Sequence, residues 1–228
     1  MIDWSLIPQY GDRLLDGTLI TLKLVLIASV IGILLALPLS LARSSPRRRY
    51  WIPAYAYIYF FRGTPLLVQL FLIYYGLGQF EAVRESLLWP VLSDAEYCGL
   101  LGLTLNTTAY TAEILRGGIR AVPKGEIEAA RAYGMGWWLL QRRIVLPRAL
   151  RIAWPPYGNE VILLLKGSAL VSTIAVWDLM GEARSIFSRT YALEVFLFAG
   201  VIYFLLTFVF TRLFHIVERR INRYLVNY

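Results

Sequence analysis

The chain has 228 residues, 58% of them hydrophobic, and a mean hydropathy of +0.57, which places it in lipid because soluble domains are only about half apolar. The net charge of +8 does not indicate nucleic-acid binding, since the basic residues lie in short segments between apolar runs and form no basic, aromatic face. With one cysteine and one histidine, the chain cannot build an internal disulfide, a Cys-rich metal site or a Cys–His catalytic pair. We interpret Cys98 as a small buried hydrophobe and His215 as an interfacial residue.

Five apolar segments predict an all-α integral membrane protein. The first, residues 18–42, has 25 residues; at ~1.5 Å per residue it covers roughly 37 Å, enough to cross a ~30 Å hydrocarbon core with tilt. The segment before it is acidic, unlike the basic start of a secretory signal, so we expect this first segment to remain as a span. The other spans are predicted near residues 52–78, 99–119, 153–177 and 194–214.

The charges between the spans predict their direction. Sixteen Lys and Arg against three Asp and Glu lie in residues 43–51, 116–151 and 212–228. The alternate segments carry four Lys and Arg against ten Asp and Glu, in residues 1–17, 79–97 and 178–194. Because cytoplasmic loops collect Lys and Arg, the N-terminus is expected outside and the C-terminus inside, as an odd number of spans requires.

The second predicted span contains an interruption. Residues 50–61 are rich in the Tyr and Trp that favour the membrane interface. Thr64 and Pro65 then have the character of an N-cap and a first helical position, so a helix is expected to restart there. Residues 65–78 are too few to cross alone. Either the span is discontinuous near Arg62–Thr64, inside protein or beside a water-filled cavity, or an interfacial helix precedes a short span.

The third predicted span is rich in Gly, Ala, Thr and Asn, which allow close helix approach in lipid, and we expect it to lie in the interior. Charged groups at membrane depth are costly and face partners or a cavity. Lys23 is expected to snorkel outward. Two interpretations remain for the other four: mutual ion pairs that lock the helices together, or a polar cavity that meets the amine and α-carboxylate of a substrate. These residues are Arg62, Glu113, Glu160 and Lys166.

Residues 125–147 form a charged, aromatic segment in the largest predicted cytoplasmic loop. "GEIEAARAYG" is typical of a short helix with acidic residues in its first turn and Gly134 as its C′ residue. "MGWWLLQRRIVLP" predicts a second helix along the membrane surface, stopped by Pro147. Such a helical elbow is suited to receiving force from a partner protein.

This segment resembles the coupling motif of the permease subunits of bacterial ABC importers, EAA-x3-G-x9-I-x-LP. The match is complete, in Glu128, Ala129, Ala130, Gly134, Ile144, Leu146 and Pro147. "FRGTPLLVQL" and "TLNTTAYTAEILRGGI" are similar to permeases for polar amino acids. "GEIEAARAYG" and "ALRIAWPPYGNEVILLLKGSAL" look more like the branch that imports histidine, lysine, arginine and ornithine, or octopine and nopaline.

The resemblance implies a type I ABC importer permease fold with five transmembrane helices. It implies a periplasmic segment at 1–17, a transmembrane domain at 18–217 with a cytoplasmic coupling loop at 120–152, and a cytoplasmic tail at 218–228. The chain would be a multi-pass protein of the bacterial inner membrane. The coupling loop would dock on the ATP-binding subunit, and the substrate path candidates are Arg62, Thr64, Glu113, Glu160 and Lys166.

The implied function is ATP-driven import of amino acids, basic ones or related opines. The chain has no G-x-x-x-x-G-K-[ST] loop, so it cannot be the ATPase. The resemblance implies no enzyme activity, catalytic residue, metal or cofactor in this chain, with ATP and Mg²⁺ on a partner dimer. Further expected partners are a second permease, identical or homologous, a periplasmic amino-acid-binding protein and the bilayer, and no nucleic acid. Alternatives are import of another polar amino acid such as glutamine, a secondary transporter, which would carry its own ion site and internal repeats, and a receptor or scaffold.

Acidic residues collect on the predicted outer segments. They form either a solvated face or a surface for a binding protein, since complementary charge steers docking. These residues are Glu81, Glu85, Asp94, Glu96, Asp178 and Glu182.

Overall fold

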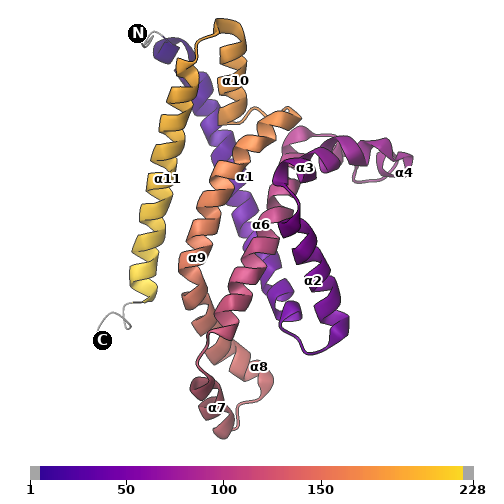
Figure 1. The fold of residues 1–228 in the computed structure, drawn as a ribbon, viewed down its shortest axis with the longest axis vertical. Helices are drawn as coiled ribbons and strands as arrows, with labels where there is room; N and C mark the ends of the chain where they lie inside the picture. Colours follow the sequence, from indigo (N-terminus) through magenta and orange to yellow (C-terminus); the bar gives the residue numbers. More distant parts are fainter. Residues whose placement is uncertain (1–5, 223–228) are drawn as a thin grey trace.

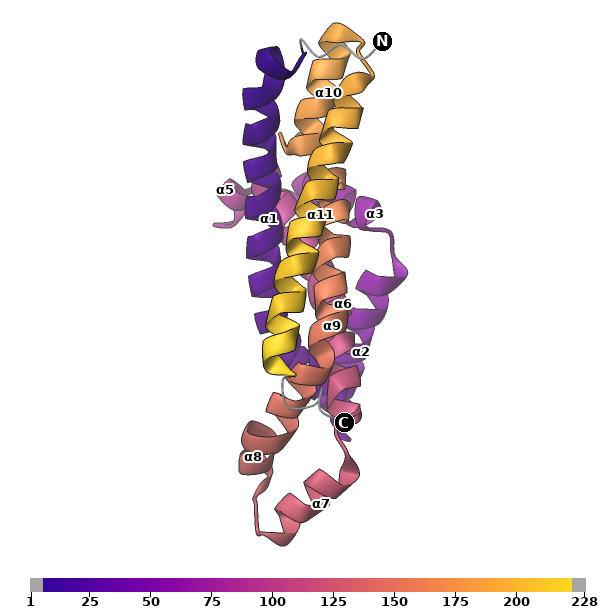
Figure 2. The same ribbon diagram turned by 90° about the vertical axis from the view of Figure 1, so that its left-hand side faces the viewer.

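The computed structural model describes residues 6–222, whose regular elements are helices (Figure 1). The long helices run along the length of the molecule at angles to one another, with α1 crossing α6, while α3 to α5 project sideways from them (Figures 1 and 2). In chain order the α-helices are α1 (Leu6–Arg43), α2 (Arg48–Gly63), α3 (Leu66–Phe71), α4 (Glu81–Arg84), α5 (Trp89–Leu92), α6 (Ala95–Arg120), α7 (Lys124–Ala132), α8 (Trp137–Leu140), α9 (Leu146–Gly167), α10 (Leu179–Thr190) and α11 (Glu194–Ile221).

Helix α6 lies at the centre of the fold. It packs against α1, α2 and α9, and its buried residues include Gly, Ala and Thr side chains along much of its length. The expectation of an interior third helix is therefore confirmed. At its far end Gly118 lies so close to α9 that a Cβ added there would stand 2.5 Å from the Ala149 carbonyl oxygen. Small side chains thus let these two backbones touch.

Two helices, α1 and α11, are long and apolar enough by themselves to cross a membrane, and the number rises to four if each of two bent pairs counts as one span. Helix α6 is not among them because it carries charged residues at both ends and polar ones between. Its neighbours are other helices, so it does not need the apolar surface that lipid demands. Exposed apolar side chains gather instead on α1 and α11, among them Leu19, Leu34, Phe204 and Leu213.

The interrupted segment is discontinuous near Arg62–Thr64, as one of the two sequence interpretations predicted: α2 ends at Gly63 and α3 begins at Leu66. The chain does break, but Pro65 is the N-cap of α3 and Leu66 its first residue, so the restart lies one residue later than predicted. Helix α2 runs alongside α6 (Figure 1), so it is not a helix lying flat at an interface. The chain then bends by 105°. Extended backbone at Thr64 and Pro65, with ψ of 144° and 136°, makes the turn because a residue before proline avoids the helical region.

Most of the acidic residues on the α10 side and at the start of α6 are engaged within the chain. Asp178 is fully buried and accepts hydrogen bonds from the backbone of α10, and Glu182 pairs with Arg13. Asp94 caps α6. Glu96, in the first turn of α6, pairs with Lys23, which lies near the middle of α1. Of the predicted acidic set, only Glu81 and Glu85 on and beside α4 are exposed without such a partner in the described residues.

The close approach of α6 and α9 predicts a matched pair of outcomes. Gly118→Ala should destabilise the protein by about 1–3 kcal/mol, because the added methyl collides with the Ala149 carbonyl and the helices must separate. Gly117→Ala, one residue earlier and with open space around it, should be neutral or slightly stabilising. Thermal unfolding of the purified protein in detergent measures both, and equal unfolding temperatures would contradict the close contact.

Candidate functional site

The break between α2 and α3 is held by two amide side chains. Gln69 Nε2 donates to the carbonyl oxygens of Phe61 (2.8 Å) and Thr64 (3.0 Å) and to Thr64 Oγ1 (2.7 Å). Asn106 of α6 donates to Gln69 Oε1 at 2.9 Å and to the Phe61 carbonyl at 3.3 Å. Carbonyls freed by a broken helix need partners where water is scarce. The predicted path residue Thr64 therefore lies in the network that closes the break.

A cavity of about 360 Å³ opens beside the break. Two of the predicted path residues line it, Arg62 and Glu113, and Gly63 of the break lines it as well. The other walls are the end of α1, the aromatic face of α2 and one ring of α6, contributed by Arg43, Tyr55, Ile58, Tyr59 and Tyr110. The cavity thus combines fixed charges of both signs with three tyrosine rings.

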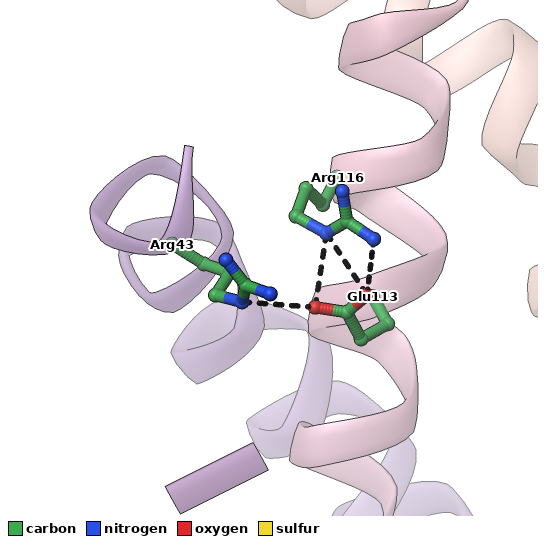
Figure 3. A network of polar contacts seen from close by, with 3 residues as sticks. All are labelled: Arg43, Glu113 and Arg116. Carbon is green, nitrogen blue, oxygen red and sulfur yellow. Dashed lines mark hydrogen bonds and ion pairs between the residues drawn. The ribbon is translucent and has the colours of Figure 1, made fainter. Parts of the chain in front are cut away.

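Glu113 is held between two arginines (Figure 3). Arg116, one turn along α6, donates from Nε to both carboxylate oxygens, at 3.0 and 2.9 Å, and from Nη2 to one of them. Arg43, the last residue of α1, lies 3.6 Å from the carboxylate on the other side. The Arg43 guanidinium also stands 4.9 Å from the ring centroids of both Trp51 and Tyr55. The cluster ties α1, α2 and α6 together and leaves Glu113 fully engaged.

Arg62 is the cation of the cavity that has no ion pair among the described residues. Its guanidinium stands 5.1 Å from the centroid of the Tyr110 ring, a cation–π contact, and the residue is exposed. Arg43, the other arginine in the cavity wall, already pairs with Glu113. Arg62 therefore leaves the cavity with more positive than negative charge. A carboxylate group is the ligand that this arrangement favours.

The remaining two path candidates lie elsewhere. Glu160 of α9 is buried and accepts a hydrogen bond from Thr107 at 3.2 Å. Lys166, near the end of α9, is exposed and lines no cavity with Arg62. Mutual ion pairing among the four charged residues is therefore wrong: in the described part of the chain none of them pairs with another. The partners of Arg62, Glu113 and Glu160 are residues that the sequence interpretation did not name, although the i, i+3 spacing of Glu113 and Arg116 was a usable signal.

At one end of the molecule, α7 and α8 form the elbow, residues 124–147 (Figure 2). The first helix ends as predicted, with Gly134 as its C′ residue at φ of 76°. The Gly134 N–H donates to the Arg131 carbonyl (2.9 Å) and the Met135 N–H to the Ala130 carbonyl (3.1 Å). This pair of bonds is the Schellman motif, which needs a residue in the left-handed region.

The residues of the predicted coupling motif divide between a core and a surface. Ala130 is buried against Val122, Leu140, Val145 and Ala149, and Ile144 packs onto the same cluster. Leu146 is half-buried, while the exposed members are Glu128, Ala129, Gly134 and Pro147. An ion pair between Glu126 of α7 and Arg148 of α9, at 3.1 Å, adds a polar tie. The elbow therefore has its own apolar core and leaves one face of α7 uncovered.

The prediction that Pro147 stops the second helix is wrong. Residues 141–145 form a π-helical turn, and the helical path continues through Leu146 and Pro147 into α9. Proline is tolerated because it lies in the first turn of α9, where the preceding π turn already shifts the hydrogen-bond pattern: Leu146 N–H donates to the Gln141 carbonyl. The elbow is thus joined to α9 without a hinge at the proline.

The family of this chain follows from a match over residues 28–223 to the family described as binding-protein-dependent transport system inner membrane component. The chain belongs to this family, so it is a membrane-embedded permease subunit of an ABC importer and not the ATPase, and its system includes a separate ATPase and a binding protein.

Individual relatives show which kind of ABC importer permease the chain resembles. The chain is 50% identical over 208 residues to the octopine transport system permease protein OccM of Rhizobium meliloti, covering 90% of this chain and 84% of that protein. It is 47% identical over 225 residues to the histidine/lysine/arginine/ornithine permease protein HisM of Salmonella typhimurium, covering 95% and 96%. A crystal structure of an amino acid ABC transporter with histidines matches with a TM-score of 0.86 and 38% identity, covering 96% and 99%. These findings confirm the type I permease fold and an amino-acid importer permease subunit.

Gly134 yields a prediction with a matched control. No atom lies within 4 Å of a Cβ added there, so a side chain is opposed only by the left-handed backbone, at about 1–2 kcal/mol. Gly134→Val should uncouple ATP hydrolysis from uptake in the reconstituted complex, whereas Gly134→Asn, which tolerates this region, should retain most coupling. Gly136→Val, at a position with φ of −65° and open space, is the control. Normal uptake per ATP in Gly134→Val would contradict the assignment.

Proposed function

We propose that this chain is the permease subunit of an ATP-driven importer for basic amino acids or related opines in the bacterial inner membrane. The observation that carries the proposal is the Schellman-capped elbow joined to α9, in a chain whose relatives transport histidine, lysine, arginine and ornithine or octopine. The elbow supplies a rigid surface for an ATPase, and the relatives supply the substrate class.

The proposed topology has five spans: α1, α2 with its bent continuation, α6, α9 and α11. In this arrangement the N-terminus is outside and the C-terminus inside. The positive-inside charge pattern supports it, and so do the positions of α7 and α8 at one end of the molecule and α10 at the other (Figure 1). The elbow would then meet a dimer of ATP-binding subunits, which hold ATP and Mg²⁺, while the chain itself holds no cofactor.

In the proposed mechanism the substrate passes through the cavity beside the α2–α3 break. Arg62 would bind the α-carboxylate that every amino acid shares, because it is exposed in the cavity and free of a carboxylate partner. Tyr59 would accept a cationic side chain on its ring face, because the rings of Tyr55 and Tyr110 already contact Arg43 and Arg62. Glu113 would hold the cavity wall in place through its ion pairs with Arg43 and Arg116. A second permease, identical or homologous, would close the path from the open side.

Closure of the ATPase dimer would move α7, and the elbow core would carry that movement to α6 and α9. Helix α6 lines the cavity and α9 carries the buried Glu160, so the path would open to one side of the membrane and then to the other. The exposed Glu81 and Glu85 beside α4 would face the loaded binding protein outside.

The substrate class can be tested by ATP hydrolysis of the complex in liposomes, assembled with the subunits encoded beside this chain. The binding protein is added loaded with arginine, histidine, octopine or glutamine. Stimulation by the basic ligands or the opine but not by glutamine is expected. Stimulation by glutamine alone would contradict the substrate class and leave the permease assignment intact.

If Arg62 binds the α-carboxylate, its replacement should weaken the binding of every amino-acid substrate. Arg62→Gln should raise the KM of uptake on the order of tenfold or more, since an unpaired ligand charge is expensive, while basal ATP hydrolysis stays unchanged. Arg212→Gln is the control, because Arg212 makes the same type of cation–π contact with Phe208 on α11, away from the cavity. An unchanged KM in Arg62→Gln would remove this residue from the path.

A further inference from the structure

A second cavity, of about 670 Å³, lies between the elbow and the ends of the long helices. Its walls come from the end of α1, the turn between α1 and α2, the end of α6 and the second half of the elbow. The residues that matter for its chemistry are Leu41, Arg47, Tyr50, Ile119, Trp137 and Gln141. None of these belongs to the cavity beside the α2–α3 break.

In the proposed topology this cavity lies at the level of the cytoplasmic membrane interface. Leu41 lies in the last turn of α1 and Ile119 in the last turn of α6, so the wall formed by the ends of these helices is apolar. Tyr50 and Trp137 on its rim are 44% and 60% exposed, and amphipathic rings of this kind settle at the headgroup level. An occupant that is apolar above and polar below fits this arrangement.

The charge around the cavity is positive and unpaired. Arg47 lines it, and four further arginines are exposed nearby in sequence on the same two segments. In the described part of the chain none of these five pairs with a carboxylate. They are Arg47, Arg48, Arg49, Arg142 and Arg143. Clusters of four to eight basic residues beside a membrane helix attract anionic lipids.

One polar group in the wall lacks a hydrogen-bond partner among residues 6–222. The Oε1 atom of Gln141 is buried and accepts no hydrogen bond from these residues, although a buried acceptor is normally satisfied. The last torsion of a glutamine is soft, so the amide can turn toward the cavity. A ligand with a hydroxyl donor would supply the missing bond, and a bare phosphate diester would not.

We propose that this cavity binds an anionic phospholipid whose headgroup carries a hydroxyl group, as phosphatidylglycerol does. The phosphate lies against Arg47, the headgroup hydroxyl donates to Gln141, and the acyl chains lie along Leu41 and Ile119. Because Gln141 and Trp137 belong to the elbow, the lipid fixes the elbow against the turn between α1 and α2. Binding does not require the proposed function, whereas an effect on coupling rests on it.

The test uses the complete complex, with its ATPase and second permease, in nanodiscs of phosphatidylcholine containing a minor fraction of phosphatidylglycerol. Native mass spectrometry then counts the lipid retained on the permease. Arg47→Gln and Gln141→Leu should each lower retention by about tenfold, the loss expected for a charge-assisted or orphaned hydrogen bond. Arg142→Gln, which removes the same charge from the elbow outside the cavity wall, is the matched control and should retain the lipid.

Two further arms separate the possible sources of binding. Phosphatidylmethanol carries the same charge without the hydroxyl, so it should be retained less well than phosphatidylglycerol by the unchanged protein and equally by Gln141→Leu. Glycerol 3-phosphate added to pure phosphatidylcholine discs should not compete. Equal losses in Arg47→Gln and Arg142→Gln would reduce the effect to diffuse surface charge and overturn the site. Absence of retained lipid in a complex that still hydrolyses ATP would overturn it without touching the transport function.

Discussion

The fold depends on the hydrogen bonds that side chains make to the free backbone carbonyls at the break between α2 and α3. In a membrane a broken helix exposes carbonyl groups that have lost their helical N–H partners and that lipid cannot satisfy, each costing several kcal/mol if left alone. Gln69 and Asn106 meet these groups, one from the helix that follows the break and one from α6. The chain can therefore turn by 105°, send α3 to α5 sideways, and leave Arg62 and Gly63 on the wall of a cavity.

Helix α6 connects this break to the elbow. Asn106 serves the break, Glu113 holds the arginine cluster, and Gly118 lies against α9. The elbow core is built on the ends of the same two helices, since it includes Val122 after α6 and Ala149 of α9. We expect a push on α7 to reach both helices together, because the close packing at Gly118 gives neither of them room to move alone.

Patterns that depend on local chemistry could be predicted from the sequence. The C′ position of Gly134 and the coupling-motif spacing follow from helix capping and from the resemblance, and the interior position of α6 follows from its small residues. Arg43 and Thr107 could not be predicted as partners of Glu113 and Glu160, because they reach these carboxylates across helices whose rotation no local pattern fixes. Pro147 was misjudged because the proline rule assumes an α-helical turn before it, and a π turn stands there. Asp178, expected on a solvent face, is buried because its carboxylate caps α10.

The central claim is that the break borders a water-filled substrate path. Since Cys98 is the only cysteine, Cys98→Ala gives a cysteine-free chain, and Gly63→Cys then places one thiol at the break, where a side chain has open space. Labelling of this thiol by a membrane-impermeant maleimide in the reconstituted complex is the most direct measurement. The account predicts rapid labelling that slows when the loaded binding protein and ATP drive transport. A thiol that stays unlabelled under all conditions would contradict it.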